Sequence, residues 1–522
     1  MKNKYRNTDS AIKAGDLILT EQPFAFVLSS KEKGNRCDNC LEKGKVLKCS
    51  GCQFVHYCGR SCQRDAWGDH KWECANLKRV SPKVIPDAAR MLAKIINRLS
   101  RGDGHSYRAF YSATSFRMWK DLMSHYSDLK TDKKRMEHFA SLCGVLHEFL
   151  KDISLPNTVE MMGLFGRMVI NSFTILDIDM NSIGTGVYLA CSIVDHSCDP
   201  NAVATFDGKT ISIRALRDMP CLDWNQIRIS YIDLMKTPYE RQTELLENYY
   251  FLCQCDRCMD ETQLKMVHAA KCLNPQCDNP VVIPWKEDCK LVMKTEIQNG
   301  HKGHANGNHE NNGQTHNENA KDLYDNGQDF NENGRDCNEN GEDRDGNGQD
   351  HKENGVNSID SVRCDECGTK YTEEQIEKFV KAMEFTELHL QSMKGASVAY
   401  VDVCKYCLSR QRGILHPLNV MHAQTLDHAF DALILVQLWE KACVYAEELV
   451  PVFRFYYGDR HPLLGLLYMK YGKILLYKMD AKKALEQLKC SEKILRITHG
   501  VNHSLYKEQL MPLLSQAMIE SS

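Results

Sequence analysis

A ladder of metal-type ligands between residues 37 and 74 constrains this chain more than any other feature. Seven cysteines and one histidine fall there in four short-spaced pairs: Cys37-x2-Cys40, Cys49-x2-Cys52, Cys58-x3-Cys62 and His70-x3-Cys74. Each spacing lets two side chains reach one tetrahedral ion, so these eight ligands suit two Zn²⁺ ions. So short a segment cannot build its own hydrophobic core. Metal binding should therefore supply most of its folding free energy, on the order of 10–16 kcal/mol per zinc.

The remaining composition indicates the compartment and the class of protein. The chain has 24 cysteines, largely in metal-spaced pairs, which favours a reducing compartment, and we expect cytoplasm, nucleus or both. A disulfide knot is the alternative, but the first residues lack the apolar stretch of a signal peptide. No apolar run is long enough to span a membrane, so we expect no membrane association.

The charge pattern bears on partners. A net charge of -3 predicts no general affinity for nucleic acid, and we expect a monomer that does not bind it. A short basic cluster is interpreted as a solvated face rather than a nucleic-acid site. It comprises Lys43, Lys45, Lys48, Arg60, Arg64 and Lys71.

Apolar periodicity predicts an α+β fold of several domains, because 522 residues exceed one hydrophobic core. Residues 16–20 and 24–28 are predicted strands, and apolar positions from about 84 to 165 recur at helical spacing. Strand patterns return at 168–232, including a hairpin around Asp207-Gly208. We therefore predict one β-rich domain that carries two insertions, the cysteine ladder and an all-helical segment.

Beyond residue 372 the pattern is helical to the end and is typical of a tetratricopeptide-like stack of helix pairs. The predicted helices span residues 373–393, 397–414, 418–435, 438–457, 462–478, 481–496 and 501–519.

Further cysteines form two more candidate metal sites. Cys253-x-Cys255-x2-Cys258 is one thiolate short of a closed tetrahedral site, and Cys198 is the best candidate for the fourth ligand. A second group, Cys272-x4-Cys277 with Cys364-x2-Cys367, has the pattern of a zinc ribbon whose knuckles are far apart in sequence. Cys404-x2-Cys407 lies in a strongly helical segment without a partner pair, so we interpret both residues as core.

Residues 296–358 form a tract of Asn, Gly, Asp, Glu, Gln and His in which Asn-Gly recurs every seven residues. It lacks the apolar seam of a coiled coil and has too few apolar residues to offset the entropy of ordering, so we predict disorder. Residues 343–348 imitate a calcium-binding loop. The position of the final bidentate ligand holds Asn354, so we expect no calcium site.

These motifs together resemble a known family. The ladder resembles the MYND zinc finger. Blocks typical of a SET methyltransferase core follow in order: Asn171-Ser-Phe-Thr, Gly184-x-Gly186-x-Tyr188, Asp195-His-Ser-Cys-Asp-Pro-Asn201 and Ile229-Ser-Tyr231. The Cys253 run resembles the post-SET zinc loop. Their combination is similar to the SMYD family of SET and MYND protein-lysine methyltransferases over nearly the whole chain except 290–360, with the C-terminal segments 457–462 and 498–504 most similar to its third vertebrate member.

The resemblance implies a β-rich SET core with an inserted MYND finger and helical insert, then a post-SET zinc loop and a C-terminal tetratricopeptide-like helical domain. The implied segments are 1–36 (N-terminal SET), 37–74 (MYND), 75–165 (helical insert), 166–235 (core SET), 236–289 (post-SET and first ribbon knuckle), 290–360 (low-complexity insert) and 361–522 (second knuckle and helical repeats). The MYND zincs interleave in the family. One ion is implied at Cys37, Cys40, Cys58 and Cys62, and the other at Cys49, Cys52, His70 and Cys74.

The resemblance also implies a catalytic site that uses S-adenosylmethionine. Tyr231 matches the catalytic tyrosine, and Phe173 and Tyr249 match walls of the lysine channel. The residues matching cofactor contacts are Asn171, Ser192, Asp195, His196 and Phe251. Without the family match, Tyr231 is interpreted as an edge-strand aromatic and Phe173 as a core residue. Implied partners are histone tails or cytosolic proteins as substrates, proline-rich peptides at the MYND finger, and a chaperone or another protein at the helical repeats.

Three departures from the family pattern motivate a second hypothesis. The family's Gly-x-Gly turn is expected to lie before Met1. Asp195 replaces an asparagine, which keeps the acceptor, loses the amide donors and adds negative charge beside the cofactor. Residues 223–226 replace an acidic Gly-Glu-Glu turn. The alternative is therefore a catalytically weak or inactive adaptor that binds proline-rich peptides and partner proteins.

Overall fold

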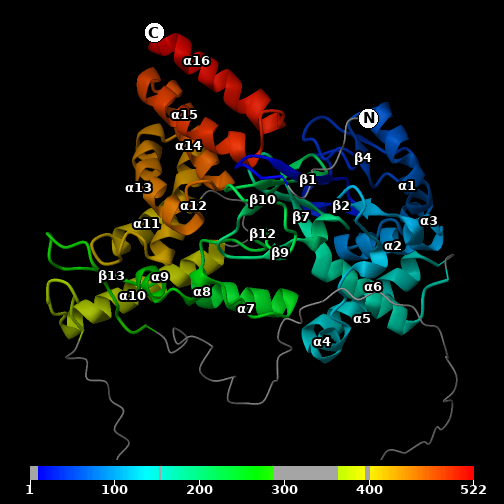
Figure 1. The fold of residues 1–522 in the computed structure, drawn as a ribbon, viewed down its shortest axis with the longest axis horizontal. Coiled ribbons are helices and arrows are strands. Elements are labelled where there is room, and N and C mark those ends of the chain that lie inside the picture. Colours follow the sequence, from blue (N-terminus) through cyan, green and yellow to red (C-terminus); the bar gives the residue numbers. More distant parts are fainter. Residues whose placement is uncertain (1–9, 152–153, 286–361, 394–399) are drawn as a thin grey trace, which may run out of the picture. The chain divides into compact units, whose positions relative to one another are not determined.

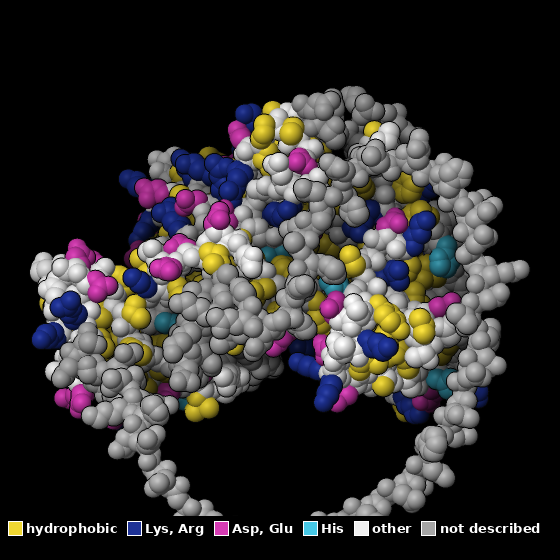
Figure 2. Space-filling view, turned by 60° about the horizontal axis from the view of Figure 1, so that its bottom comes forward, with side chains coloured by type: hydrophobic (Ala, Val, Ile, Leu, Met, Phe, Trp, Pro, Cys, Tyr) yellow, Lys and Arg dark blue, Asp and Glu magenta, His cyan; other side chains and the backbone are white. Residues whose placement is uncertain are grey.

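The computed structural model describes residues 10–151, 154–285, 362–393 and 400–522 (Figure 1). The predicted disordered tract, the calcium-like loop and the start of the predicted helix at 397 lie outside these ranges. Within them, no helix is both long and apolar enough to cross a lipid bilayer. On the face shown in Figure 2, basic and acidic side chains are interspersed, in line with the net charge of -3.

Short strands build the β-rich part in small sheets. Two sheets have three strands, in the orders β1-β11-β10 and β2-β8-β7, and four pairs are β12-β9, β13-β14, β3-β4 and β5-β6. The strands are β1 Leu17–Glu21, β2 Ala25–Leu28, β3 Leu47–Lys48, β4 His56–Tyr57, β5 Ala109–Phe110, β6 Phe116–Arg117, β7 Ser172–Leu176, β8 Ser182–Val187, β9 Asp195–His196, β10 Ala202–Asp207, β11 Thr210–Ala215, β12 Arg228–Ile229, β13 Ala270–Lys271 and β14 Pro280–Val281.

The strand predictions are confirmed, but the pairing joins strands that lie far apart in the sequence, which a local pattern does not reveal. The β10-β11 hairpin turns at Gly208, whose φ of +57° favours glycine. β1 and β2 are adjacent in sequence but do not pair with each other. β1 pairs with β11 and β2 with β8, both antiparallel, so each closes a sheet with strands from beyond the helical insert. This interleaving confirms that the cysteine ladder and the helices are inserted into one β-rich domain.

Helices fill the insert and the segment after the core. Those before residue 290 are α1 Arg60–Val80, α2 Asp87–Ser100, α3 Asp103–Ser106, α4 Tyr126–Thr131, α5 Lys133–Phe149, α6 Thr158–Asn171, α7 Pro238–Tyr249, α8 Asp256–Met259 and α9 Glu261–Val267. The prediction of an all-helical insert is wrong at β5-β6. There Ser112 Oγ accepts backbone N–H bonds from Thr114 and Ser115 and stabilises a turn in place of a helix.

The C-terminal region is helical, as predicted. It contains α10 Glu373–Met393, α11 Val401–Gln411, α12 Val420–Leu435, α13 Trp439–Tyr457, α14 Pro462–Tyr477, α15 Ala481–Thr498 and α16 Met511–Ser521. The predicted last helix, 501–519, differs in its first half. Residues Leu505–Leu510 form a π-helical turn that leads directly into α16.

The helical region is anchored on the β-rich part by polar contacts. The buried His503 contacts the carbonyl of Phe206 in β10 through Nε2 at 2.9 Å, and the Thr205 hydroxyl donates to the Thr498 carbonyl at 3.5 Å. The Tyr457 hydroxyl donates to Asp233 Oδ1 at 2.8 Å. Asp233 lies two residues after Tyr231, so α13 fixes the chain directly beyond the candidate catalytic residue.

The buried His422 in α12 should make stability depend on pH. Its Nδ1 lies 2.9 Å from Gln411 Oε1, an oxygen that only accepts, and burial lowers the pKa of His422 to about 4. Between pH 6.5 and about 4 the unfolded chain therefore binds the extra proton, and the free energy of unfolding falls as pH falls. At pH 5.5 the loss is about 1.4 kcal/mol. Urea unfolding of zinc-loaded protein at pH 7.0 and 5.5 measures this difference. From the higher to the lower pH, the free energy of unfolding should fall by about 1.4 kcal/mol less in His422→Gln than in the wild type. Equal dependence in the variant and the wild type would contradict this assignment.

Candidate active site and metal centres

Four groups of thiol and imidazole ligands converge in the structure. In each group the ligand atoms all lie within 4.8 Å of one another. The groups are Cys37, Cys40, Cys58 and Cys62; Cys49, Cys52, His70 and Cys74; Cys198, Cys253, Cys255 and Cys258; and Cys272, Cys277, Cys364 and Cys367. Four sulfurs around one zinc, with bonds of about 2.3 Å, lie about 3.8 Å apart, so the separations within these groups are of the size that a zinc site requires.

The two clusters of the ladder interleave along the sequence as the resemblance implied. Cys40 and Cys58 place their Sγ atoms 3.8 Å apart in one, and Cys49 and Cys74 do so at the same distance in the other. Gly51 is needed in the second cluster for space. A Cβ there would lie 2.8 Å from Cys74 Sγ, so only glycine lets the backbone pass this close to the ligands.

A buried ion network stands behind His70. Glu73 is 1% exposed, and its carboxylate contacts His70 Nδ1 at 3.3 Å and accepts from Arg90 Nε at 2.9 Å. Bonding to Glu73 puts the proton on Nδ1 and leaves Nε2, which lies 3.6 Å from Cys52 Sγ, free to ligate a metal. Arg90, in α2, also lies 3.7 Å from Asp38 of the first cluster's knuckle. The network therefore joins both metal sites to the helical insert.

We expect Glu73→Gln to weaken the zinc bound by His70 by roughly 10- to 100-fold, because the histidine loses the carboxylate that orients it. Competition with a chromophoric chelator on the full chain measures this. Glu148→Gln is the control, since Glu148 is exposed and its carboxylate pairs with Lys83 at the surface. Equal zinc affinity in Glu73→Gln and the wild type would show that the carboxylate does not support the site.

The third cluster brings Cys198 to the segment after α7. Its Sγ lies 3.4 Å from Cys258 Sγ and 4.0 Å from Cys253 Sγ. Arg241 is fully buried beside it, with a guanidinium nitrogen 3.8 Å from Cys258 Sγ. A buried guanidinium is costly unless a negative charge lies near it, and a zinc held by four thiolates carries a formal charge of -2. The residues therefore fit a zinc ion here.

His196 connects this cluster to the candidate catalytic tyrosine. The short strands β9 and β12 pair in parallel, with Ile229 opposite His196, and this brings Tyr231 beside the imidazole. The backbone N–H of Tyr231 donates to His196 Nδ1 at 3.0 Å, so the ring proton is on Nε2, which lies 3.2 Å from Cys198 Sγ. Burial lowers the pKa of His196 to about 4, so the ring is neutral at physiological pH.

Aromatic rings gather around Tyr231. Its ring centroid lies 5.0 Å from that of Tyr249 and 5.3 Å from that of His196, and Phe251 follows at 6.0 Å from His196. The Tyr231 hydroxyl donates to the carbonyl of Val194 at 2.6 Å. Burial raises the pKa of Tyr231, so its hydroxyl stays protonated and is not a general base. We call these four rings, Tyr231, Tyr249, His196 and Phe251, the aromatic enclosure.

The other predicted site residues lie on neighbouring elements. Asn171 ends α6, and its amide nitrogen donates to the carbonyls of Met123 and Arg167, both at 2.8 Å. Ser192 lies in the 3₁₀ turn η3, Cys191–Ile193, and donates to the Tyr188 carbonyl at 2.5 Å. The ring of Phe173, on β7, meets Tyr188 edge-on at 5.7 Å.

Comparison with known proteins identifies the family. Residues 37–74 match the model of the MYND finger. Human histone-lysine N-methyltransferase SMYD3 is 26% identical over 512 residues, which cover 96% of this chain and 92% of that protein. Arabidopsis thaliana histone-lysine N-methyltransferase ASHR1 is 24% identical over 100% of this chain and 94% of its own length. Xenopus laevis N-lysine methyltransferase SMYD2-A is 30% identical over 47% of this chain and 55% of its own length. This chain belongs to the SMYD family.

Two of the positions at which the sequence is expected to depart from the family pattern make contacts in the structure. The carboxylate of Asp195, where the resemblance implies an asparagine, lies 3.8 Å from Arg228 on the neighbouring strand. Asp195 is 71% exposed in its side chain, so this pair offsets charge without adding much stability. In the replaced turn at residues 223–226, the Trp224 ring packs edge-on against Tyr111 at 5.3 Å. The turn thereby contacts the helical insert.

Several residues near the SMYD site carry no sequence motif. Glu21, at the end of β1, accepts backbone bonds from Ala190 and Cys191 at 3.1 and 2.8 Å and so fixes the turn that carries Ser192. The positive charges of Arg228 and of Arg117, in the unexpected β6, oppose the rise in the Tyr231 pKa, although burial outweighs them. Buried or charged partners of this kind are recognised from contacts, and no spacing signal could have identified them.

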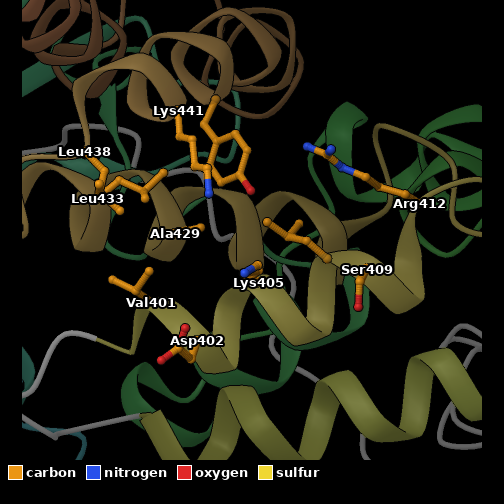
Figure 3. A pocket seen from close by; sticks show the side chains of 11 residues that line it. Val401, Asp402, Lys405, Ser409, Arg412, Ala429, Leu433, Leu438 and Lys441 are labelled. Atoms are coloured by element: carbon orange, nitrogen blue, oxygen red, sulfur yellow. The ribbon is translucent and has the colours of Figure 1, made fainter.

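The helical region of the SMYD chain contains a groove of about 400 Å³ between α11, α12 and α13 (Figure 3). Its apolar lining includes Leu408, Leu433 and Leu438. Lys405, from α11, and Lys441, from α13, extend toward the hollow between these helices. The groove therefore combines an apolar floor with the basic side chains of Lys405, Arg412 and Lys441 and one carboxylate, Asp402, and Tyr231 does not line it.

Proposed function

We propose that this SMYD chain is an S-adenosylmethionine-dependent protein-lysine N-methyltransferase that acts on histone or other proteins. One observation carries the proposal: the aromatic enclosure holds a neutral tyrosine hydroxyl directly after the paired strands β9 and β12 and is fixed to a cysteine cluster through His196. The names of the family relatives, histone-lysine and N-lysine methyltransferases, support the same reaction class.

The enclosure suits a lysine amine that must be uncharged to react. Lysine titrates near 10.4 in water, and bringing its pKa to ~8 costs roughly 3 kcal/mol. Partly buried rings supply desolvation, which favours the neutral amine, while the positive charges of Arg117 and Arg228 are opposed by the carboxylate of Asp195. The neutral Tyr231 hydroxyl, which donates to Val194 in the structure, would orient the amine and place it in line with the methyl donor.

The residues fit S-adenosylmethionine, whose sulfonium supplies the transferable methyl group. Phe251 and His196 would provide ring faces and Asp195 a carboxylate acceptor. Asn171 keeps its Oδ1 as an acceptor, since its amide hydrogens are committed to the backbone carbonyls of Met123 and Arg167. Ser192 sits on a turn that Glu21 rigidifies.

The test is methyl transfer by the full chain from radiolabelled S-adenosylmethionine to histones and to a lysine peptide library. We expect label on lysine and micromolar or tighter cofactor binding by calorimetry. Cofactor binding without transfer to any substrate would reject the enzyme assignment and leave the fold intact.

The free cysteines of the described region favour cytoplasm and nucleus as locations, which tagged protein in cells would test.

A second candidate function is partner binding, and the groove of Figure 3 favours it. We propose that the apolar floor with Lys405 and Lys441 holds an acidic peptide of a chaperone or another protein. Lys405→Glu with Lys441→Glu should weaken binding of acidic peptides at least tenfold without changing methyl transfer. Equal binding by both proteins would exclude the groove.

The MYND finger is proposed to bind proline-rich peptides. Trp67, on α1, is 44% exposed and its ring lies 6.1 Å from that of the candidate ligand His70. Exposed aromatic rings are the surfaces on which proline-rich segments dock. Trp67→Ala should abolish measurable binding of such peptides while zinc content stays unchanged.

A further inference from the structure

The fourth cysteine cluster joins two segments that lie far apart in the sequence. Cys272 and Cys367 place their Sγ atoms 3.5 Å apart, and Cys277 and Cys364 theirs at 3.7 Å. Cys277 and Cys364 are 87 positions apart in the chain. The two Sγ–Sγ distances far exceed the S–S bond of about 2.05 Å in a disulfide. They approach the distances between thiolates bound to one tetrahedral ion.

Each pair of cysteines lies in a compact backbone knuckle. The first closes the β13-β14 hairpin, in which Ala270 pairs with Val281 and Lys271 with Pro280. In the second, the N–H of Cys364 donates to the Thr369 carbonyl at 2.9 Å and the N–H of Gly368 to the Cys364 carbonyl at 3.0 Å. Gly368 has a φ of +70°, which favours glycine directly after a ligand.

Polar groups around the sulfurs suit thiolates. The amide of Asn279 donates to Cys364 Sγ at 3.6 Å, and the Thr369 hydroxyl lies 3.1 Å from Cys367 Sγ. Donors aimed at sulfur stabilise its negative charge and orient the ligand, as the surroundings of bound zinc do. The pair Cys404 and Cys407 has the same spacing but lies buried within α11, outside the four ligand groups of the described residues.

We propose that Cys272, Cys277, Cys364 and Cys367 bind a structural Zn²⁺ ion, separate from the two MYND ions and the Cys198 site, and that this ion clamps the start of the helical region to the β13-β14 hairpin. The hairpin is itself fixed to the loop before α12. Lys271 N–H donates to the Ile414 carbonyl at 2.8 Å, and Asn419 Nδ2 donates to the Ala269 carbonyl at 3.1 Å.

The second knuckle leads directly into α10, and the Tyr371 hydroxyl donates to the Lys271 carbonyl between the knuckles. The ion would thus hold α10 from one side while the hairpin holds α12 from the other. Closing so long a loop restricts the unfolded chain, so the clamp should stabilise the whole helical region.

Metal counting on the full chain tests the site. Purified wild-type protein should carry four zinc ions, and Cys364→Ser with Cys367→Ser should carry three. Cys404→Ser with Cys407→Ser, matched in spacing, should keep four. We call Cys364→Ser with Cys367→Ser the ribbon variant. Hydrogen exchange of β13, β14 and the first turns of α10 should accelerate at least tenfold in the ribbon variant and in neither of the other two proteins. Three ions in both the wild type and the ribbon variant would overturn the proposal.

A second measurement needs no variant and covers the case in which the ribbon variant fails to fold. Cys367 and Cys221 are both exposed, but only Cys367 belongs to a cluster. Alkylation of native wild-type protein, resolved by peptide mass spectrometry, should label Cys221 rapidly and Cys367 only after zinc is removed by a chelator. Equal labelling of the two before chelation, or a disulfide within the cluster under non-reducing conditions, would exclude the metal.

Discussion

Tyr231→Phe is expected to reduce methyl transfer by about 10²-fold while leaving the protein folded, because the amine loses the group that orients it. The substitution removes only the hydroxyl that donates to Val194 and that we propose to orient the amine. The ring contacts with Tyr249 and His196 remain. The rate is measured with saturating radiolabelled cofactor and the best peptide substrate, and circular dichroism checks the fold.

The neighbouring Tyr250 provides the matched control. It also donates its hydroxyl to an acceptor, Asp132 Oδ2 at 3.0 Å, but its ring contact is with His125, outside the aromatic enclosure. Tyr250→Phe should keep the wild-type rate within a factor of three. If Tyr231→Phe did the same, the enclosure would not be the catalytic site.

Cys198→Ser should have the largest effect on the folded structure. The substitution removes one ligand from the third cluster, whose zinc contributes on the order of 10 kcal/mol, and leaves Arg241 buried beside fewer negative charges. We expect loss of one zinc per chain, a fall in Tm of more than 10 °C and loss of methyl transfer. Elemental analysis and thermal unfolding measure the first two.

Cys191→Ser is the control for Cys198→Ser. Cys191 is equally buried in the same β-rich part but belongs to none of the four ligand groups of the described region. It should keep every zinc ion and lose about 1–2 kcal/mol of stability. A zinc count unchanged in Cys198→Ser would place the metal elsewhere.

Local sequence patterns predict most of the strands and helices but little of the strand pairing. The strands at 17–21 and 25–28 follow from alternation, and the C-terminal helices from periodicity. That β1 pairs with β11 depends on contacts between residues nearly two hundred positions apart, such as Leu17 with Arg214, which no local pattern records. The β5-β6 hairpin was missed because its strands are too short to show alternation.

The residues of the candidate site also fall into two groups, those that a local motif predicts and those that are recognised only by their contacts. Ligand cysteines were predictable because metal geometry imposes short spacings, and Tyr231 because it lies in a motif. Glu73, Arg90 and Arg241 were not, because a charged residue is normally solvent-exposed and its burial is visible only with its partners. Because burying a charge is costly, the sequence alone predicts that these residues are exposed. In the structure, their burial indicates that they have a specific role.

His196 has a consequence for how this protein can evolve. Its imidazole accepts a bond from the amide of Tyr231, lies with its other nitrogen 3.2 Å from Cys198 Sγ, and packs at a tilt against the Phe251 ring, with 6.0 Å between the ring centroids. A glutamine could reproduce the two polar contacts but not the ring, and a phenylalanine the ring but neither polar contact. Few substitutions should therefore be tolerated at position 196. Homologues that lack the neighbouring cysteine ligands should also lack this histidine.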